Sequence, residues 1–572
     1  MNLKVNKRDG PAKIGELTLD NKSIVTPNIL FVDTARFKSP NFADAILTNI
    51  DKKTKKPCLK FSDKNILEKE DYETEKYYIG TEKLDLIILK YASQLFDNSS
   101  RFTDNAVNLV EKNSCQKAIY SPSIAKPSNL SLLSYLGIDL FDSTSAITAA
   151  RNKVMLFSDG EYNINDLEEL PCSCPICNSH KEKPAELSFE NLLNHNYYAL
   201  FNELKQVRNA IKKVDLRNLV EKRVKSNPNL ISVLRNLDKN HYNFLEEKTP
   251  VVNNNVIYAN SKESLARPEI IRFQDRIINR YSKPQSTKIL LLLPCSAKKP
   301  YSFSKSHRFF REKIQMSNNP NIIHEVIVTS PMGIVPRELE LVYPADSYDI
   351  PVTGIWDEDE KKMIRSLLLS YLKKNNYEKI IAHLPLEILD FTSDILKKAT
   401  VTCVDHPTSK KSLEKLGCIL EEYSQKYDKQ NYKDRLKENI ECLASYQFGK
   451  DAGKLLMKDT EIKGKYPFFK IMQDNKQLGM LTEKRGYISL TLNGADKIKK
   501  ISKHCIEISD DFELVGSVFA PGVINADKQI RIGDEVLVFK NKKLCAVGVA
   551  KMNGSDMKKL NHGESVKTRH RI

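Results

Sequence analysis

Four short apolar runs and one amphipathic stretch predict a layered α/β domain in the middle of the chain. The runs cover residues 289–293, 325–329, 379–383 and 400–404, and each has the length of a strand. Residues 359–375 repeat apolar side chains with a period near 3.6, which indicates a helix. Strands that alternate with helices are typical of a doubly wound sheet with helices on both faces.

Residues 289–293 are apolar throughout, which suits a parallel strand covered on both faces. Open α/β sheets bind ligands at the carboxyl ends of such strands. Cys295 follows directly, in the segment Pro-Cys-Ser-Ala-Lys-Lys-Pro-Tyr-Ser-Phe-Ser-Lys-Ser-His. We therefore place the chemistry there, in a crevice that the other strand ends share. Those ends supply Ser330, Arg337, Glu338, His383 and Asp405.

The chain as a whole is too long for one hydrophobic core and divides by pattern into four parts. Residues 1–280 form the first part, 281–426 the α/β core, and 427–499 a small α+β domain that we expect to bind RNA. Residues 500–572 show short strands of period two separated by glycine turns, which predict a small β-barrel.

Composition narrows the class of protein. No apolar stretch approaches the roughly 18–20 residues of a membrane span, and the first residues lack the apolar core of a signal peptide. We expect a cytoplasmic protein with no membrane partner. The net charge of +17 favours a polyanionic partner such as nucleic acid, although a lysine-rich, solvated surface explains the charge equally well.

Clustered thiols give the most specific local signal. Cys172, Cys174 and Cys177 lie within six residues, and His195 follows in a helical stretch. Three thiolates and one imidazole close a tetrahedral site with no position left for water, so we predict structural Zn²⁺. His180 is the rival fourth ligand. We favour His195 because its helix would attach the cluster to the domain.

These residues carry a resemblance to a known family. The zinc cluster, the segment Gly-Ile-Asp-Leu-Phe-Asp-Ser at residues 137–143, and the opening Arg-Asp-Gly-Pro-Ala-Lys-Ile-Gly-Glu-Leu are similar to archaeal tRNA-guanine transglycosylases. The resemblance implies a zinc-bearing (β/α)8 barrel. The span before the cysteines is short for a complete barrel, so we expect a degenerate or partial one.

Asp142 occupies the position of that family's aspartate nucleophile. The segment Asp-Ser-Gly-Gly-Phe-Gln, which supplies the family's other catalytic aspartate and part of its base pocket, is missing. Base exchange needs both a nucleophile and a route for the proton, so the loss argues against transglycosylation. Asp142 then either holds the substrate nucleotide or is an ordinary solvated or helix-capping aspartate.

The carboxyl-terminal segments resemble a PUA domain, a β-barrel that binds structured RNA. Together with the Pro-Cys and Lys-Pro-Tyr pattern, the domain order resembles the archaeosine synthase family, paralogues of the transglycosylases with an added α/β core. That resemblance implies addition of free lysine to the nitrile of 7-cyano-7-deazaguanine at position 15 of tRNA. A radical-SAM partner would then complete archaeosine.

The residue chemistry allows two routes to such an adduct. In one, the Cys295 thiolate adds to the nitrile carbon and an amine displaces it; Lys299 or a protonated His307 would lower the thiol pKa. In the other, the amine attacks directly, with His307 as base and Tyr301 or Ser304 bonding the developing nitrogen anion. The sequence does not decide between them.

Arg337 and Glu338 are candidates for binding the amino acid's charged groups, although a solvated helix start explains them nearly as well. Two other functions stay open: a noncatalytic subunit that presents tRNA to another enzyme, and a true base-exchange transglycosylase. The sequence leaves the oligomeric state open, a homodimer included.

Overall fold

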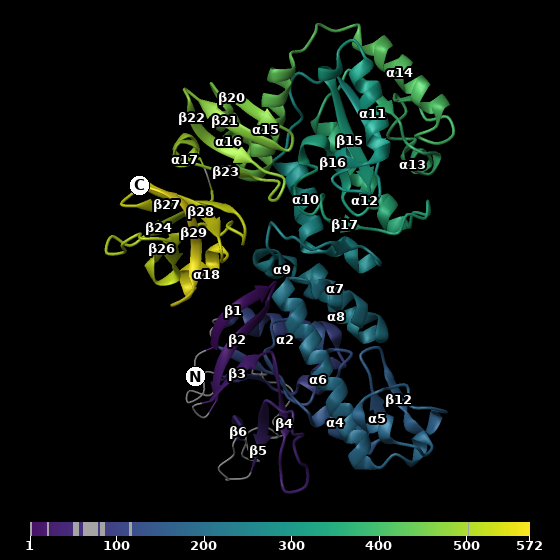
Figure 1. Cartoon of the computed structure of the whole chain (residues 1–572), viewed down its shortest axis with the longest axis vertical. Coiled ribbons are helices and arrows are strands. Elements are labelled where there is room, and N and C mark those ends of the chain that lie inside the picture. Colours follow the sequence, from purple (N-terminus) through teal and green to yellow (C-terminus); the bar gives the residue numbers. More distant parts are fainter. Residues whose placement is uncertain are drawn as a thin grey trace. The chain divides into compact units, whose positions relative to one another are not determined.

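The computed structural model describes residues 3–19, 22–49, 56–60, 78–80, 86–113, 117–501 and 503–572. The chain forms two compact units, Met1–Thr249 and Pro250–Ile572, which are drawn in Figure 1. Each unit is described by itself. The finer division into four parts stays a prediction. In the described part of the chain, no helix is long and apolar enough to cross a membrane.

A mostly parallel sheet forms the centre of the first unit. Its order is β6-β5-β4-β10-β9-β8-β7, and all described neighbours pair in parallel except β7 with β8. The strands are β4 (Asn28–Val32), β5 (Ala45–Thr48), β6 (Cys58–Lys60), β7 (Tyr78–Gly80), β8 (Leu86–Leu89), β9 (Ala118–Tyr120) and β10 (Leu140–Asp142). Every residue of β4 and β10 is buried, as expected for strands covered on both faces. The partial barrel predicted from the sequence is confirmed.

Two smaller sheets and several helices complete this unit (Figure 1). The sheets are β1 (Leu3–Asp9), β2 (Ala12–Leu19) and β3 (Lys22–Thr26), and the hairpin β11 (Val154–Leu156) with β12 (Glu161–Asn163). The helices are α1 (Ala92–Phe96), α2 (Ser99–Lys112), α3 (Leu130–Tyr135), α4 (Thr144–Arg151), α5 (Pro175–Ser179), α6 (Phe189–Lys213), α7 (Leu216–Arg223), α8 (Pro228–Asn240) and α9 (Tyr242–Lys248).

The second unit contains the predicted doubly wound sheet, in the order β16-β15-β14-β18-β19. All neighbours are parallel except β15 with β16. The strands are β14 (Ile289–Pro294), β15 (Ile323–Thr329), β16 (Gly333–Pro336), β18 (Lys379–Ala382) and β19 (Thr400–Val401). The flanking helices are α10 (Pro268–Asn279), α11 (Lys305–Met316), α12 (Glu358–Lys374), α13 (Leu386–Thr392) and α14 (Lys410–Ser424). β13 (Ile257–Tyr258) pairs separately with β17 (Tyr348–Asp349).

The strand β14 is buried on both faces because its side chains alternate between two cores. Ile289, Leu291 and Leu293 pack with α11 and α14, whereas Leu290 and Leu292 pack with α10 and α12. All five are fully buried. The sequence pattern therefore fixes the strand between two helical layers, and its carboxyl end carries Cys295.

The rest of the second unit consists of two antiparallel-rich sheets. The first holds β20 (Glu461–Lys465), β21 (Phe468–Gln473), β22 (Lys476–Leu481) and β23 (Ile488–Leu490), beside α15 (Tyr432–Phe448), α16 (Lys450–Met457) and α17 (Leu492–Ile498). The second has the order β25-β29-β28-β27-β24-β26. Its elements are β24 (Cys505–Ile508), β25 (Val518–Phe519), β26 (Val523–Ala526), β27 (Glu535–Lys540), β28 (Lys543–Ala550), β29 (Glu564–Arg571) and α18 (Gly554–Lys559).

We predict that Leu291→Ala lowers the free energy of unfolding of the second unit by about 2–5 kcal/mol, because the truncated side chain leaves a cavity between β14, α11 and α14. Urea unfolding of the full chain measures the change. Leu369→Ala is the matched control, since Leu369 lies on α12 with 43% of its surface exposed. Equal losses for the two variants would contradict the packing described.

Candidate functional site

Cys295 lies in the loop directly after β14, at the edge of a cavity of about 400 Å³. Mostly apolar side chains line this cavity, among them Phe310 from α11 and Trp356, the chain's single tryptophan. Val352 and Ile355, in the loop before α12, also line it and are 77% and 83% exposed. The thiol therefore faces a largely apolar space with an exposed apolar loop beside it.

Burial raises the pKa of the Cys295 thiol above its ordinary value. A hydrogen bond with Thr329 and the nearby charge of Lys299 act in the opposite direction and offset part of the effect. At neutral pH the neutral thiol is thus the main form. A reaction through the thiolate would need a base to remove this proton.

Lys299 lies next to the thiol and above an aromatic ring. Its Nζ is 4.0 Å from the centre of the Tyr348 ring, a cation–π contact. Burial lowers the pKa of Lys299, while Cys295 and Asp349 oppose that shift. The lowered pKa increases the fraction of neutral amine, which is the form that accepts a proton.

Three hydroxyl groups form a buried chain that ends near Cys295. Tyr301, the first residue of a short 3₁₀ turn, is fully buried, and its hydroxyl lies 2.6 Å from that of Tyr348. The Tyr348 hydroxyl lies 2.6 Å from Thr329 Oγ1. Burial raises the pKa of Tyr301 well above its ordinary value, so the phenol stays protonated. The chain offers rotatable O–H donors beside the thiol.

Ser304 and His307 hold the start of α11 rather than facing the cavity beside Cys295. The Ser304 hydroxyl accepts a hydrogen bond from the backbone N–H of His307 as the N-cap of the helix. Arg337 Nη2 donates to His307 Nδ1 at 2.8 Å, which leaves the ring proton on Nε2. That nitrogen donates to the Pro294 carbonyl at 3.0 Å.

His307 is fully buried and stays neutral. Burial, together with the positive charges of Arg337 and Arg311, lowers the pKa of the imidazole to about 2. Both ring nitrogens are engaged, so the imidazole fixes the backbone one residue before Cys295. This geometry supports a positioning role for His307, and its proposed catalytic role stays a prediction.

Arg337 and Glu338 lie in a 3₁₀ turn after β16, where they line a second cavity. Arg337 donates to Glu325 and to Glu340 Oε2, the latter at 2.9 Å. Tyr281 donates to Glu338 Oε1 at 2.6 Å. Burial opposes the charge on Glu338, but His324 and Arg435 outweigh it and lower the pKa of the carboxyl to about 2.

The predicted crevice at the strand ends is partly formed. Ser330 and the segment after Asp405 line the cavity with Cys295. His383 is fully buried and lies behind that wall, with its ring nitrogens 2.8 Å from Thr402 Oγ1 and 2.7 Å from the Pro407 carbonyl. The structure thus brings Cys295, Lys299 and Tyr301 together and places Arg337 and Glu338 at the second cavity.

In the first unit, the three cysteines and His195 gather into one cluster, with all four ligand atoms within 4.8 Å of one another. The distances are 3.5 Å between Cys174 Sγ and Cys177 Sγ, and 3.6 and 3.4 Å from these sulfurs to His195 Nδ1. Bonds of about 2.0–2.3 Å to a tetrahedral zinc place ligand atoms roughly 3.5–3.8 Å apart, so the residues fit this ion.

The surroundings of the cluster favour His195 over His180. His195 Nε2 donates to the Leu156 carbonyl at 3.2 Å, so Nδ1 is free to bind a metal. The neighbouring Asn196 amide bonds to Leu156 N and to the Val154 carbonyl, which attaches α6 to β11. His180 is partly exposed and lies outside the cluster. The helix that attaches the cluster to the domain is present as predicted.

Asp142 ends β10 with its carboxylate fully engaged. Oδ2 accepts from the Tyr120 hydroxyl at 2.7 Å and from Ser123 N at 2.8 Å, and Oδ1 accepts from Thr144 N at 2.8 Å. The side chain is 1% exposed. These bonds tie the loop after β9 to the start of α4, so the carboxylate holds the wall of a cavity in the first unit.

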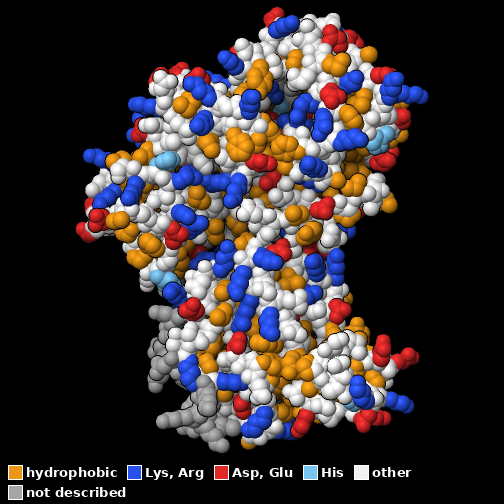
Figure 2. Space-filling view, in the orientation of Figure 1, with side chains coloured by type: hydrophobic (Ala, Val, Ile, Leu, Met, Phe, Trp, Pro, Cys, Tyr) orange, Lys and Arg blue, Asp and Glu red, His pale blue; other side chains and the backbone are white. Residues whose placement is uncertain are grey.

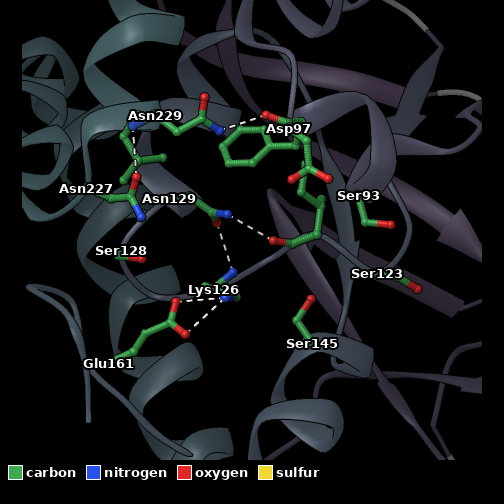
Figure 3. Close-up of a pocket in the computed structure, with 13 residues that line it drawn as sticks. Ser93, Asp97, Ser123, Lys126, Ser128, Asn129, Ser145, Glu161, Asn227 and Asn229 are labelled. Atoms are coloured by element: carbon green, nitrogen blue, oxygen red, sulfur yellow. Dashed lines mark hydrogen bonds and ion pairs between the residues drawn. The ribbon is translucent and has the colours of Figure 1, made fainter.

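That cavity has a volume of about 510 Å³, and most of the residues that line it are polar (Figure 3). Ser123 and Ser145 line it, from the loop after β9 and from α4. Lys126 pairs there with Glu161, with Nζ 2.7 Å from Oε1. On the surface seen in Figure 2, Lys and Arg side chains are spread over both units and mixed with acidic ones. The positive charge is therefore dispersed over this face.

Three family models match parts of the chain. Residues 94–229 match the queuine tRNA-ribosyltransferase family, residues 270–420 a domain of unknown function (DUF5591), and residues 512–572 the PUA domain. The fold and the zinc-type cluster thus define a transglycosylase-related protein with an added α/β core and a PUA domain.

The chain belongs to the archaeosine synthase family. It is 38% identical over 508 residues to archaeosine synthase subunit alpha of Methanosarcina acetivorans, covering 85% of this chain and 80% of that protein. It is 35% identical to the archaeosine synthase of Haloferax volcanii, covering 99% and 98%. It is 27% identical to a tRNA-guanine(15) transglycosylase of Methanobrevibacter smithii, covering 76% and 63%.

Sequence reasoning missed Tyr348, Thr329 as a partner of the thiol, and Trp356. Thr329 ends a predicted strand, so its position at the sheet edge was a signal that could have identified it. Tyr348 begins the two-residue strand β17 and Trp356 lies in a loop, so neither belongs to a periodic pattern, and only the folded chain brings them near Cys295.

We predict one zinc ion per chain in the protein as purified from cells, measured by elemental analysis. Cys177→Ser removes a ligand and should release most of the metal and lower the first unit's melting temperature by at least about 5 °C. Cys418→Ser is the control, because Cys418 is an exposed thiol of the second unit and is not one of the four cluster residues. Full zinc content in the Cys177 variant would contradict the assignment.

His307 makes stability depend on pH. Its folded pKa of about 2 lies below the unfolded value of about 6.5, so acid protonates only the unfolded chain. Between pH 6 and 5, the wild-type free energy of unfolding should fall by up to about 1.4 kcal/mol more than that of His307→Gln. Urea unfolding at both pH values measures this difference, and parallel losses would contradict a buried neutral imidazole.

Proposed function

We propose that the chain is a tRNA-modifying enzyme of archaeosine biosynthesis that adds free lysine to the nitrile of 7-cyano-7-deazaguanine at position 15 of tRNA. The support is the relationship to archaeosine synthases over 99% of the chain. The observation that supports the chemistry is Cys295 at the edge of an apolar cavity, with Lys299 and a chain of hydroxyl groups close to the thiol.

The reaction adds N–H across the nitrile. In the covalent route, the Cys295 sulfur bonds to the nitrile carbon, one C–N π bond breaks, and the nitrogen takes a proton to give a thioimidate. A lysine amine then bonds to the same carbon, the C–S bond breaks, and the thiol is restored. The product is an amidine that carries the whole lysine, so no oxidant or reductant is needed.

The neighbours of Cys295 suit this sequence of steps. The neutral thiol must lose its proton, and the Lys299 amine, with its lowered pKa, is the adjacent acceptor. The hydroxyl of Thr329, backed by Tyr348 and Tyr301, donates to the Ser330 carbonyl at 3.0 Å in the structure and would turn to donate to the developing nitrogen anion. His307 fixes the loop through the Pro294 carbonyl and takes no proton itself.

The apolar cavity suits the flat base that carries the nitrile. Trp356 and the exposed Val352 and Ile355 provide apolar surface against which an unstacked base can pack. The PUA-type barrel and the net positive charge support binding of tRNA. The zinc site would stabilise the first unit and takes no part in the chemistry, because its four ligands leave no open position.

Direct attack by the lysine amine is the second route, with Lys299 rather than His307 as the proton acceptor. Base exchange is less well supported, because the Asp142 carboxylate already accepts three hydrogen bonds. A radical-SAM enzyme would act on the lysine adduct in the following step.

The two routes differ in their need for Cys295. We expect Cys295→Ala to lower the rate of labelled-lysine transfer to nitrile-bearing tRNA at least about 10³-fold with unchanged tRNA affinity. The wild-type rate should rise above neutral pH, because the thiol pKa is raised. Cys418→Ala, at an exposed thiol, is the control. A Cys295 variant with full activity would exclude the covalent route and leave direct attack.

A further inference from the structure

A second cavity of about 310 Å³ lies in the second unit, on the side of the α/β core that faces α15. Its walls come from α11, β15, the turn after β16 and the first half of α15, with Tyr466 and Phe469 from the neighbouring sheet. This volume is at the lower end of the range for small-molecule sites, about 300–1,000 Å³. None of the roles described so far uses it.

Arg435, in the first turn of α15, lines this cavity and is 92% buried, with 8% of its surface exposed. Its Nη1 has no hydrogen-bond partner, and in the described part of the chain no carboxylate lies within ion-pair distance of the guanidinium. Glu338 lies close enough for its charge to interact with the guanidinium, but no carboxylate bonds to it, and a buried donor without a partner is costly unless a ligand supplies one.

The acidic side chains of the cavity wall are already committed to other partners. Arg337 pairs with Glu325 and Glu340, and Glu340 also accepts from Ser302 and from the Tyr466 hydroxyl. Glu338 accepts from Tyr281 and lies 3.3 Å from His324 Nε2. None of these carboxylates bonds to Arg435 in the structure.

Asn439 lies one helical turn after Arg435, so the two side chains emerge on the same face of α15. It also lines the cavity, and its buried Oδ1 has no hydrogen-bond partner. The pair thus presents a free cationic donor next to a free amide acceptor. A free α-amino acid carries the complementary groups, a carboxylate and an ammonium, on a single carbon atom.

We infer that this cavity binds a free α-amino acid, with its α-carboxylate on Arg435 and its α-ammonium on Asn439. The identification of the amino acid as lysine rests on the proposed function. The match between the cavity and a zwitterion does not depend on that function. The wall is also coupled to the reactive loop, because Arg337 bonds to His307, which bonds to the carbonyl before Cys295.

Isothermal titration calorimetry of the full chain with L-lysine tests the inference. Wild-type protein should bind lysine at least about tenfold more tightly than cadaverine, which lacks the carboxylate, or 6-aminohexanoate, which lacks the α-ammonium. Arg435→Gln should weaken lysine binding at least about tenfold, and Arg435→Lys should restore only part of it, because lysine lacks the planar fork. Asn439→Ala should also weaken binding.

Lys433→Gln is the matched control, an exposed cation on the same helix that does not line the cavity; its lysine affinity should stay unchanged. Circular dichroism melting of each variant separates lost binding from lost folding. Three results would each overturn the inference. The first is equal binding of cadaverine and lysine by the wild-type protein, and the second is an unchanged lysine affinity in folded Arg435→Gln. The third is that the wild-type protein binds neither lysine nor any other amino acid. Inorganic phosphate that competes with lysine at equal affinity would show a plain anion site and overturn it too.

Lysine transfer to tRNA separates this inference from the proposed function. If wild-type protein transfers lysine and folded Arg435→Gln does so with an unchanged KM for lysine, the inference is wrong and the proposed function stands. If wild-type protein binds an amino acid through Arg435 but transfers none, the proposed function fails and the binding site stands.

Discussion

The guanidinium of Arg337 joins the parts of the α/β core on which the site depends. It pairs with Glu325 on β15 and with Glu340, and it donates to His307, which holds the Pro294 carbonyl at the end of β14. Buried ion pairs add little net stability, but they fix orientation when every donor and acceptor is used. Here the network sets the tautomer of His307 and the path of the loop that carries Cys295.

The same network separates two kinds of chemical environment. On one side, Cys295 lies at an apolar cavity with Lys299 near its thiol, and burial favours the neutral forms of both side chains. On the other side, the cavity beside α15 keeps charged groups, among them Glu338 with its lowered pKa and Arg435. A nitrile-bearing base suits the first environment and a zwitterionic amino acid suits the second, as expected for an enzyme that joins two such substrates.

Local patterns in the sequence predicted the elements and the metal cluster. Five consecutive apolar residues predicted β14, because only a strand between two helical layers buries every one of them. The Cys172–Cys177 spacing predicted a metal site, since ligands close in sequence stay close in space. The partial barrel followed from a family resemblance combined with a short span.

Local patterns could not predict the contacts between segments that are far apart in the sequence. Tyr348 reaches Tyr301 across 47 residues, and Arg337 reaches His307 across 30, through turns without periodicity. The neutral state of His307 depends on those contacts, so the sequence offered it as a base or a cation while the fold engages both nitrogens. Nothing in the sequence separates Arg435 from the other cations of its helix, and only its burial beside a cavity distinguishes it.

The most direct test of the central claim is the mass of the modified nucleoside. Wild-type protein would be incubated with tRNA that carries 7-cyano-7-deazaguanine and with isotopically labelled lysine, and the RNA would then be digested and analysed by mass spectrometry. The account predicts a nucleoside heavier by one intact lysine, without any partner enzyme. An unchanged nucleoside, despite demonstrated tRNA binding, would contradict amine addition and favour a subunit that presents tRNA to another enzyme.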